Sequence, residues 1–207
     1  KFFLIILVCF FLFILIYNIF HYDPILGYDA EAHYAYVDAF SRYMPRAIHI
    51  PTEIESREFF SPPLTYIFPS FIQVICRNLA DSNNLLEYCK PVYGKASQIF
   101  QNILYLISVF INILTLKKLT KKNSFNISFL LMLMMLAVNY RTISMIRGEA
   151  YILFFLSLLI YKFVSVEIKK FNYNYKDVLG FGFIIGCLAL SRQWVFFIFL
   201  AFFVTYF

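Results

Sequence analysis

The side chains best suited to chemistry lie in the longest polar segment of the chain, residues 27–66. Residues 21–62 hold seven of the twelve acidic residues and all three histidines. Asp29 and Glu31 come soon after the first apolar segment. A carboxyl group that is partly desolvated near a membrane surface can have its pKa raised toward the range that suits a general base. Asp29 and Glu31 are therefore the two candidate bases.

A second interpretation of Asp29 is structural, because Asp is a preferred N-cap residue and a helix is predicted to begin at Ala30. His33 follows four residues after Asp29, on the same face of that helix. There it could orient a substrate hydroxyl or ligate a metal ion. The spacing of the chain's Cys residues matches no metal-binding motif, so no metal or other cofactor is predicted.

Arginines supply the opposite charge, and the topology described below places all seven on the same side as the polar segment. A planar guanidinium group can hold a phosphate through two hydrogen bonds, unlike the point charge of lysine. Arg147 and Glu149 stand at the start of one apolar segment. Another apolar segment is interrupted by Arg192, Gln193 and Trp194. These three residues could hold, respectively, a phosphate, a hydroxyl, and a sugar or polyprenyl face. Snorkelling of arginine to the membrane interface is the alternative explanation.

Composition places the chain among integral membrane proteins. Of its 207 residues, 61% are hydrophobic and 21% aromatic, and only 14% are charged, whereas average globular domains are about 25% charged. The formal charge of +6 comes with lysines in short clusters between apolar runs, as in cytoplasmic loops, so nucleic acid is not a predicted partner. The chain begins with Lys1 and stops inside an apolar run, so we expect it to be part of a longer protein.

Two helices of the polar segment are predicted to lie on the membrane. Residues 30–43 can form an amphipathic helix that ends at the Met44-Pro45 step. Its apolar residues recur on one face, which predicts a helix on the membrane surface. An extended acidic connector, residues 50–60, leads to a second apolar helix over residues 64–79, which is predicted to lie in the interface without spanning the membrane.

The positive-inside rule favours this placement of residues 64–79. If that helix does not span, nine of the eleven lysines, Lys1 among them, lie on one side. The predicted fold is then an all-α, polytopic transmembrane helix bundle in one domain, residues 1–207, whose first extracytoplasmic loop contains the two membrane-lying amphipathic helices. The predicted outer loop is residues 21–96, the remaining helices fall in 97–207, and the predicted spans are residues 2–20, 97–116, 125–140, 150–166 and 178–190, with another beginning at residue 195.

The four cysteines fall into two groups. Cys76 and Cys89 lie on the same predicted outer side and could form a disulfide in an oxidising compartment. Cys9 and Cys187 fall in apolar runs, where cysteine behaves as a small hydrophobic residue.

Four short motifs share the predicted outer side: Tyr-Asp-Ala-Glu-Ala-His-Tyr (28–34), Phe-Ser-Pro-Pro-Leu-Thr-Tyr (60–66), Arg-Gly-Glu-Ala-Tyr (147–151) and Ser-Arg-Gln-Trp (191–194). Together with the topology, they resemble the N-terminal half of polytopic GT-C glycosyltransferases. Within that class the similarity is to protein O-mannosyltransferases and lipid A aminoarabinose transferases, glycosyltransferase family 39. The resemblance covers nearly the whole chain.

This resemblance implies an enzyme that transfers a sugar from a polyprenyl- or dolichyl-phosphate donor to a lipid, glycan or protein acceptor, with inversion at the anomeric carbon. By position, Asp29 would be the base that deprotonates the acceptor hydroxyl. Glu31 is the alternative, because Ala30 separates two carboxylates that are adjacent in the family. The catalytic loop would face the outside of a prokaryotic plasma membrane or the lumen of the endoplasmic reticulum. The residues predicted to bind substrate are His33, Tyr34, Glu58, Pro63, Tyr66, Arg147, Glu149, Arg192, Gln193 and Trp194.

Two other classes of protein compete with this interpretation. A multi-pass transporter or lipid flippase would carry charges or helix breaks at mid-membrane depth. Here the ionisable residues gather at the outer ends of the predicted spans, and only Arg192 is ambiguous. A non-catalytic membrane subunit that binds a partner through its outer loop is the third interpretation.

Overall fold

The fold of the chain is all-helical, as the sequence predicts. A computed structural model describes residues 2–27, 29–79, 85–120, 123–135, 139–140, 143–168, 174–195 and 197. Within these residues the chain forms seven α-helices and one short 3-10 helix, Gln193–Val195, and no strand.

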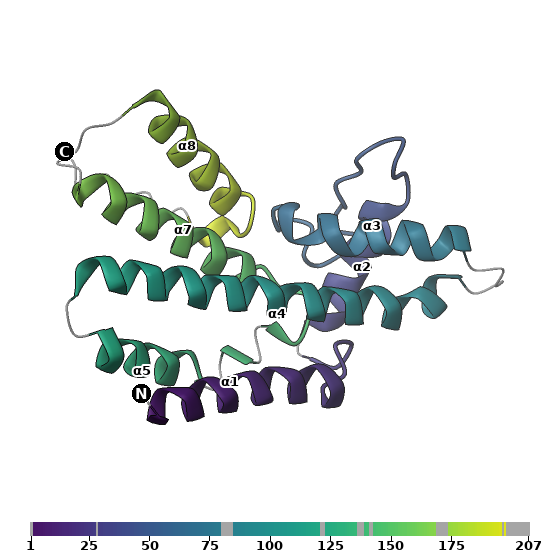
Figure 1. The fold of residues 1–207 in the computed structure, drawn as a ribbon. Coiled ribbons are helices and arrows are strands. Elements are labelled where there is room, and N and C mark those ends of the chain that lie inside the picture. The colour runs from purple at the N-terminus through teal and green to yellow at the C-terminus, as the bar shows by residue number, and fades with distance from the viewer. Residues whose placement is uncertain are drawn as a thin grey trace.

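Helix α4, Leu85–Leu119, is the longest helix and runs through the middle of the fold (Figure 1). Its most extensive contacts are with α7, Glu149–Ile168, and with α3, Leu64–Leu79. Helix α7 lies along one side of α4, and α3 lies beside the N-terminal half of α4. The two partners of α4 therefore occupy different parts of its length.

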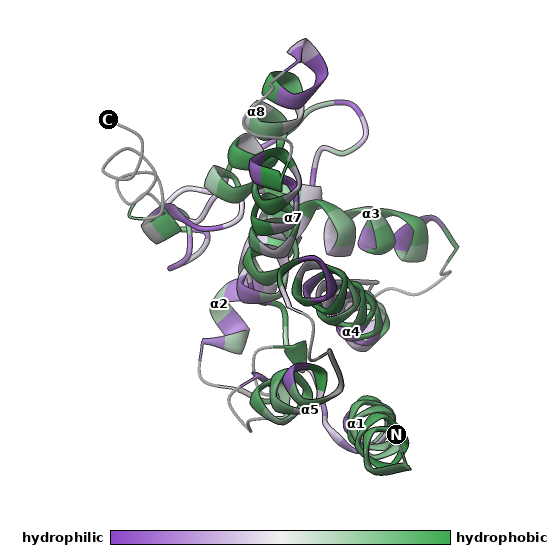
Figure 2. Ribbon diagram, turned by 60° about the vertical axis from the view of Figure 1, so that its left-hand side comes forward, coloured by the Kyte–Doolittle hydropathy of each residue, from purple (hydrophilic) through white to green (hydrophobic). Residues whose placement is uncertain are grey.

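The other helices complete the arrangement around α4. Helices α1, Phe2–His21, and α5, Asn123–Met134, lie on the side of α4 away from α7 (Figures 1 and 2). Helix α8, Tyr175–Ala189, packs against α7, and α2, Ala30–Ser41, packs against α3. The described helices are thus arranged around α4, with a smaller α2–α3 unit beside one end of it.

Among the described residues, three helical segments are long and apolar enough to cross a membrane: α1, residues Tyr88–Leu119 of α4, and α7. A 20-residue helix rises about 30 Å, which matches the thickness of the hydrocarbon core of a bilayer. Figure 2 shows α1 and most of α4 in the colours of apolar residues. These helices indicate a membrane protein.

The predicted span at residues 97–116 is part of a helix that begins much earlier, at Leu85. Two polar side chains near position 97, those of Lys95 and Gln98, are hydrogen-bonded within the fold. The Lys95 ammonium group donates to the Ile19 and Tyr22 carbonyls, and Gln98 Nε2 donates to the Tyr22 carbonyl at 3.3 Å. These bonds place a positive charge at the carboxyl end of α1, where it is favourable. The prediction that the outer loop extends to residue 96 and the helix begins at residue 97 is therefore wrong.

Of the predicted span at residues 125–140, the described part is mainly α5, which ends at Met134 after 12 residues and is shorter than the spanning helices. Side chains outside α5 donate hydrogen bonds to its last carbonyl groups. The Tyr105 hydroxyl donates to the Met134 carbonyl at 2.5 Å, and Asn139 Nδ2 donates to the Leu133 carbonyl at 3.3 Å. Residues 136–138 lie outside the described residues.

The two later spans have different outcomes. Residues 150–166 fall within α7, Glu149–Ile168, so that prediction is confirmed as a helix. Residues 178–190 correspond to α8, whose 15 residues are fewer than the spanning helices have. Of the segment that begins at residue 195, only Val195 and Phe197 are described.

Helix α2 does not lie with its apolar face on a membrane. Tyr36 and Val37 are fully buried, and Phe40 is 1% exposed. They pack with Tyr66 of α3 and Tyr93 of α4 in one hydrophobic cluster. The apolar face that predicts a surface helix is therefore covered by protein.

Helix α3 has the opposite arrangement. Its buried residues include Thr65, Ser70 and Gln73, whereas an apolar stripe at four-residue spacing is exposed. The stripe consists of Ile67, Phe71, Ile75 and Leu79. A helix whose polar face meets protein and whose apolar face is uncovered has the pattern of a membrane-lying helix.

Buried polar groups and a disulfide fasten α2, α3 and α4 together. Asp38 of α2 accepts hydrogen bonds from Gln73 of α3 and from the hydroxyl of Tyr93 of α4, the latter at 3.1 Å. Burial raises the pKa of Asp38, while these hydrogen bonds oppose the shift. Cys76 of α3 and Cys89 of α4 form a disulfide, the pairing that the sequence leaves open.

Candidate functional site

The structure brings together the starts of α2, α3 and α7 and the turn that follows α8. The Leu64 N–H group donates to the Leu190 carbonyl at 3.1 Å. One residue further along each segment, the Thr65 hydroxyl donates to the Ser191 carbonyl at 3.3 Å. These bonds join the motif at residues 60–66 to the motif at residues 191–194.

Gly148 allows the start of α7 to reach the same place. A Cβ atom at this position would lie 2.6 Å from the Ser191 carbonyl oxygen and 3.2 Å from Thr65 Oγ1. Because real Cβ atoms do not approach backbone oxygen so closely, any larger residue would push the segments apart. The close approach sets Arg147 and Glu149 beside Arg192.

The backbone around Arg147 is held by Gln101 of α4. Gln101 Nε2 donates to the Met145 carbonyl at 2.7 Å, and Gln101 Oε1 accepts from the Arg147 N–H group at 3.0 Å. The Arg147 Nε–H group lies 3.2 Å from Met145 Sδ. Gln101 is only 1% exposed, so this double hydrogen bond is protected from water.

Glu149 lies between the two arginines. Its Oε1 atom is 4.0 Å from Arg147 Nη1 and 4.0 Å from Arg192 Nη2. Its Oε2 atom is buried without a hydrogen-bond partner in the described part of the chain. Distances of 4.0 Å exceed those of charge-assisted hydrogen bonds, about 2.7–2.9 Å. At these distances neither guanidinium group makes a hydrogen bond to Glu149.

Asp29 lies next to this arginine pair, at the N-cap position of α2, and its side chain does not cap the helix. Asp29 Oδ2 is 3.9 Å from Arg147 Nη2. Asp29 occupies the residue before α2, but its side chain makes no capping hydrogen bond and its φ is +61°. Asp is among the few residues that tolerate this left-handed conformation. Asp29 therefore occupies the N-cap position that the sequence predicts, and its carbonyl accepts from the His33 N–H group at 3.2 Å, but its carboxylate, 44% exposed, is directed to Arg147 instead of capping the helix.

His33 is the neutral, buried neighbour of these charges. Its Nδ1 atom is 2.7 Å from the Tyr66 hydroxyl. Burial, helped by the positive charges of Arg192 and Arg147, lowers the pKa of His33 from 6.5 to about 4, although the charge of Asp29 opposes the shift. Burial also raises the pKa of Tyr66. The imidazole is therefore uncharged at neutral pH and linked to an uncharged phenol.

A cavity of about 660 Å³ opens between the start of α2 and the loop at residues 53–58. It is lined by both candidate bases, Asp29 and Glu31, and by Glu58, whose carboxylate accepts a hydrogen bond from the Ser61 hydroxyl. The cavity also has Arg57 in its wall. Across the described ranges, no three His, Cys, Asp or Glu side chains gather closely enough to hold a metal ion.

Some residues predicted to bind substrate lie elsewhere. Tyr34 is 3% exposed and packs against Tyr93 in the cluster between α2 and α4, with ring centroids 5.2 Å apart. The Pro63 carbonyl accepts a hydrogen bond from the Tyr66 N–H group at 2.9 Å, which shapes the start of α3. Gln193 is exposed in the 3-10 helix. The side chain of Trp194 lies outside what the structure describes.

The sequence analysis missed Gln101, Thr65 and Ser191, whose contacts assemble the site. Gln101 had a signal, because it is one of several amide residues in the predicted span at residues 97–116. Thr65 belongs to the motif at residues 60–66 and Ser191 to the motif at 191–194. Their contact spans 126 positions of the chain, which no local pattern reveals.

Comparison with known proteins adds no relative. No protein family, no curated protein and no solved structure matches the chain. The function is therefore argued from the site alone.

Proposed function

We propose that this protein is a multi-pass membrane glycosyltransferase that moves a sugar from a polyprenyl-phosphate donor to a hydroxyl acceptor. The observation that supports it is the meeting of Asp29 with Arg147, Glu149 and Arg192 from three distant segments. Transfer of a sugar from a phosphate requires a base for the attacking hydroxyl and positive charge for the departing phosphate. This site supplies both within one neighbourhood.

The proposed reaction is a single displacement with inversion. The acceptor oxygen attacks the anomeric carbon while its proton passes to Asp29. The bond between the anomeric carbon and the phosphate oxygen breaks, and the electron pair leaves on the phosphate. Arg147 and Arg192 bind that phosphate and stabilise its growing charge. Asp29 is preferred over Glu31 as the base because its carboxylate is the one beside Arg147, at 3.9 Å.

The neighbouring residues have supporting roles in this proposal. Glu149 holds the two arginines at one place without hydrogen-bonding them. Neutral His33 and Tyr66 can orient a sugar or acceptor hydroxyl without adding charge next to Asp29. The acidic cavity between α2 and residues 53–58 is the proposed entry for the acceptor.

The proposed topology places this site on the extracytoplasmic side. Lysines gather at the opposite ends of α4 and α7, as the positive-inside rule requires. A disulfide between Cys76 and Cys89 fits an oxidising compartment. The exposed apolar stripe of α3 fits a helix lying on the outer surface of the bilayer.

The test is transfer of labelled sugar from a polyprenyl-phosphate donor by the full-length protein. We expect donor-dependent transfer that is abolished in the Asp29→Asn, Glu31→Gln double variant. A Glu167→Gln variant, changed at an exposed carboxylate in the last turn of α7, far from the site, serves as the control and retains activity. Undiminished transfer by the double variant would overturn the proposal.

A further inference from the structure

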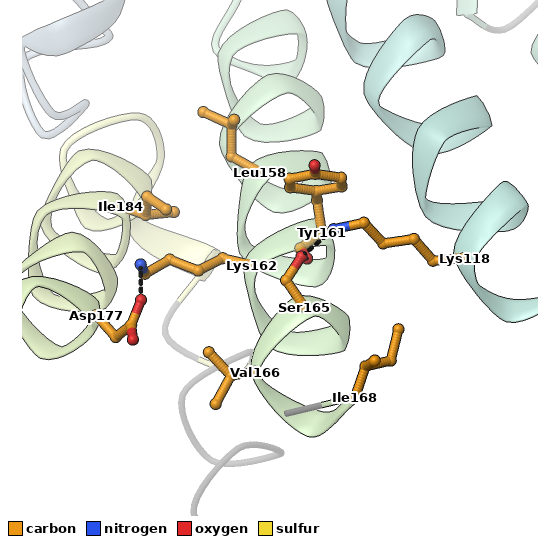
Figure 3. Close-up of a pocket in the computed structure, with 9 residues that line it drawn as sticks. All are labelled: Lys118, Leu158, Tyr161, Lys162, Ser165, Val166, Ile168, Asp177 and Ile184. Carbon is orange, nitrogen blue, oxygen red and sulfur yellow. Dashed lines mark hydrogen bonds and ion pairs between the residues drawn. The ribbon is translucent and has the colours of Figure 1, made fainter. Parts of the chain in front are cut away.

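A second cavity lies at the opposite end of α7 from the candidate site. It measures about 630 Å³ and lies between the last turn of α4, the last turns of α7 and the first turns of α8 (Figure 3). Helix α7 runs from Glu149 at the candidate site to Ile168 at this cavity. Its 20 residues rise about 30 Å, the thickness of the hydrocarbon core. Under the proposed topology, the cavity therefore lies at the cytoplasmic membrane interface.

Lys118 supplies a positioned cation in this cavity. Its ammonium group lies 3.9 Å from the centre of the Tyr161 ring and donates a hydrogen bond to Ser165 Oγ. The Ser165 hydroxyl in turn donates to the Tyr161 carbonyl at 2.6 Å, which orients its lone pairs toward Lys118. An ammonium group has three N–H donors, so the bond to Ser165 leaves it capacity for an anion.

The other charges of the cavity largely cancel. Lys162 Nζ is 2.9 Å from Asp177 Oδ1, and this pair sits on the α8 side of the cavity in Figure 3. The net charge of the lining is therefore +1, from Lys118. The remaining wall is aliphatic and consists of Leu158, Val166, Ile168 and Ile184. Such a lining suits a ligand with one negative charge attached to an apolar chain.

We propose that this cavity binds the phosphodiester headgroup of an anionic phospholipid from the cytoplasmic leaflet. The phosphodiester carries one negative charge, which matches Lys118, and its acyl chains can follow the aliphatic wall into the bilayer. Basic pockets between transmembrane helices at this depth are suited to anionic headgroups. The inference rests on the topology that forms part of the proposed function, and not on the transfer chemistry.

The experiment uses the full-length protein in nanodiscs of phosphatidylcholine with and without phosphatidylglycerol. Bound lipid is counted by native mass spectrometry after release. We expect phosphatidylglycerol to be enriched on the wild-type protein, and Lys118→Gln to weaken its retention about fivefold, the effect of one lysine near an anionic surface. The control is Lys117→Gln, which removes the same charge from the neighbouring residue, outside the cavity lining, and retains the lipid.

Equal retention by the two variants, or no preference for phosphatidylglycerol over phosphatidylcholine, would overturn the proposal. Inorganic phosphate added at millimolar concentration should not displace the lipid, and displacement would identify a site for free phosphate instead. Sugar transfer is measured on the same samples. Loss of lipid selectivity in Lys118→Gln without any transfer activity in the wild type would support this site while contradicting the proposed function.

Discussion

Helices α1 and α2 follow each other in the chain and show opposite relations between sequence and burial. All but a few of the 20 residues of α1 are apolar, yet only Phe11 and Leu15 are buried. Helix α2 has 12 residues, several of them polar, and eight are buried, including His33 and Ser41. In these two helices the apolar segment faces lipid under the proposed topology, and the more polar segment is the one that packs against protein.

The difference has a physical origin. Lipid tails are as apolar as a leucine side chain, so a helix in the bilayer gains little by exchanging lipid for protein contacts. Outside the bilayer, where the proposed topology puts α2, the hydrophobic effect drives aromatic residues together, as in the stacked pair of Tyr36 and Tyr66, whose centroids are 3.7 Å apart. The site is built on this second type of packing, which can hold side chains in fixed positions.

The largest expected difference in stability is between the loss of a buried aromatic residue in α2 and the loss of an exposed one in α1. Tyr36→Ala removes a fully buried ring and its 3.1 Å hydrogen bond to the Ser61 carbonyl. We expect the free energy of unfolding to fall by about 3–5 kcal/mol. The side chain of Phe13 in α1 is 61% exposed. Phe13→Ala should change the free energy of unfolding by less than about 1 kcal/mol, because the shorter side chain still faces lipid tails. Thermal unfolding in nanodiscs measures both, and equal losses would contradict the comparison.

Two glycines offer a matched pair of smaller effect. A Cβ at Gly94 of α4 would overlap the buried Tyr34 hydroxyl, whereas a Cβ at Gly182 of α8 meets no described atom within 4 Å. We expect Gly94→Ala to destabilise the protein by about 1–3 kcal/mol through overpacking. Gly182→Ala should be stabilising by up to about 1 kcal/mol, the helix propensity difference. The melting temperatures of the two variants give the comparison, and a neutral Gly94→Ala would show that α2 and α4 pack loosely.

His33 predicts how the stability of the α2–α3 unit depends on pH. Its folded pKa of about 4 lies below the ordinary value of 6.5, so the unfolded chain binds more protons between these values. Stability from this group is present above pH 6.5 and is lost as pH falls toward 4. Between pH 7 and pH 5 the loss should be about 2 kcal/mol.

The measurement is thermal unfolding at pH 7 and at pH 5. His33→Asn keeps a polar group near the Tyr66 hydroxyl but removes the titration, so the pH dependence should become shallower. An unchanged slope in that variant would show that His33 is not held neutral by burial.

The sequence predicts the membrane character, the all-helical class and the helices α3 and α7 well, because their periodicity and hydropathy are local properties. It fails at the start of α4 and the end of α5. There, the polar groups are satisfied by residues distant in the chain. Lys95 donates a hydrogen bond to the Tyr22 carbonyl just after α1, and Tyr105 donates one to the Met134 carbonyl at the end of α5. Local patterns contain no information about such bonds.

For the candidate site, the sequence supplies the residue types but not their arrangement. Asp29, Arg147, Glu149 and Arg192 stand out as charges beside apolar segments, and the structure brings them together. Tyr34 belongs to the motif at residues 28–34 but packs in the core. Gln101 determines the position of Arg147 without any charge that would distinguish it.

The most direct test of the proposed site compares the two candidate carboxylates one at a time, by measuring kcat for sugar transfer with Asp29→Asn and with Glu31→Gln. Because Asp29 lies beside Arg147, we expect Asp29→Asn to lower kcat by about 10²–10⁴-fold, the contribution of a general base, and Glu31→Gln to lower it by less than about tenfold. Normal thermal unfolding of both variants would show that they fold. A wild-type rate in Asp29→Asn would contradict the proposed site.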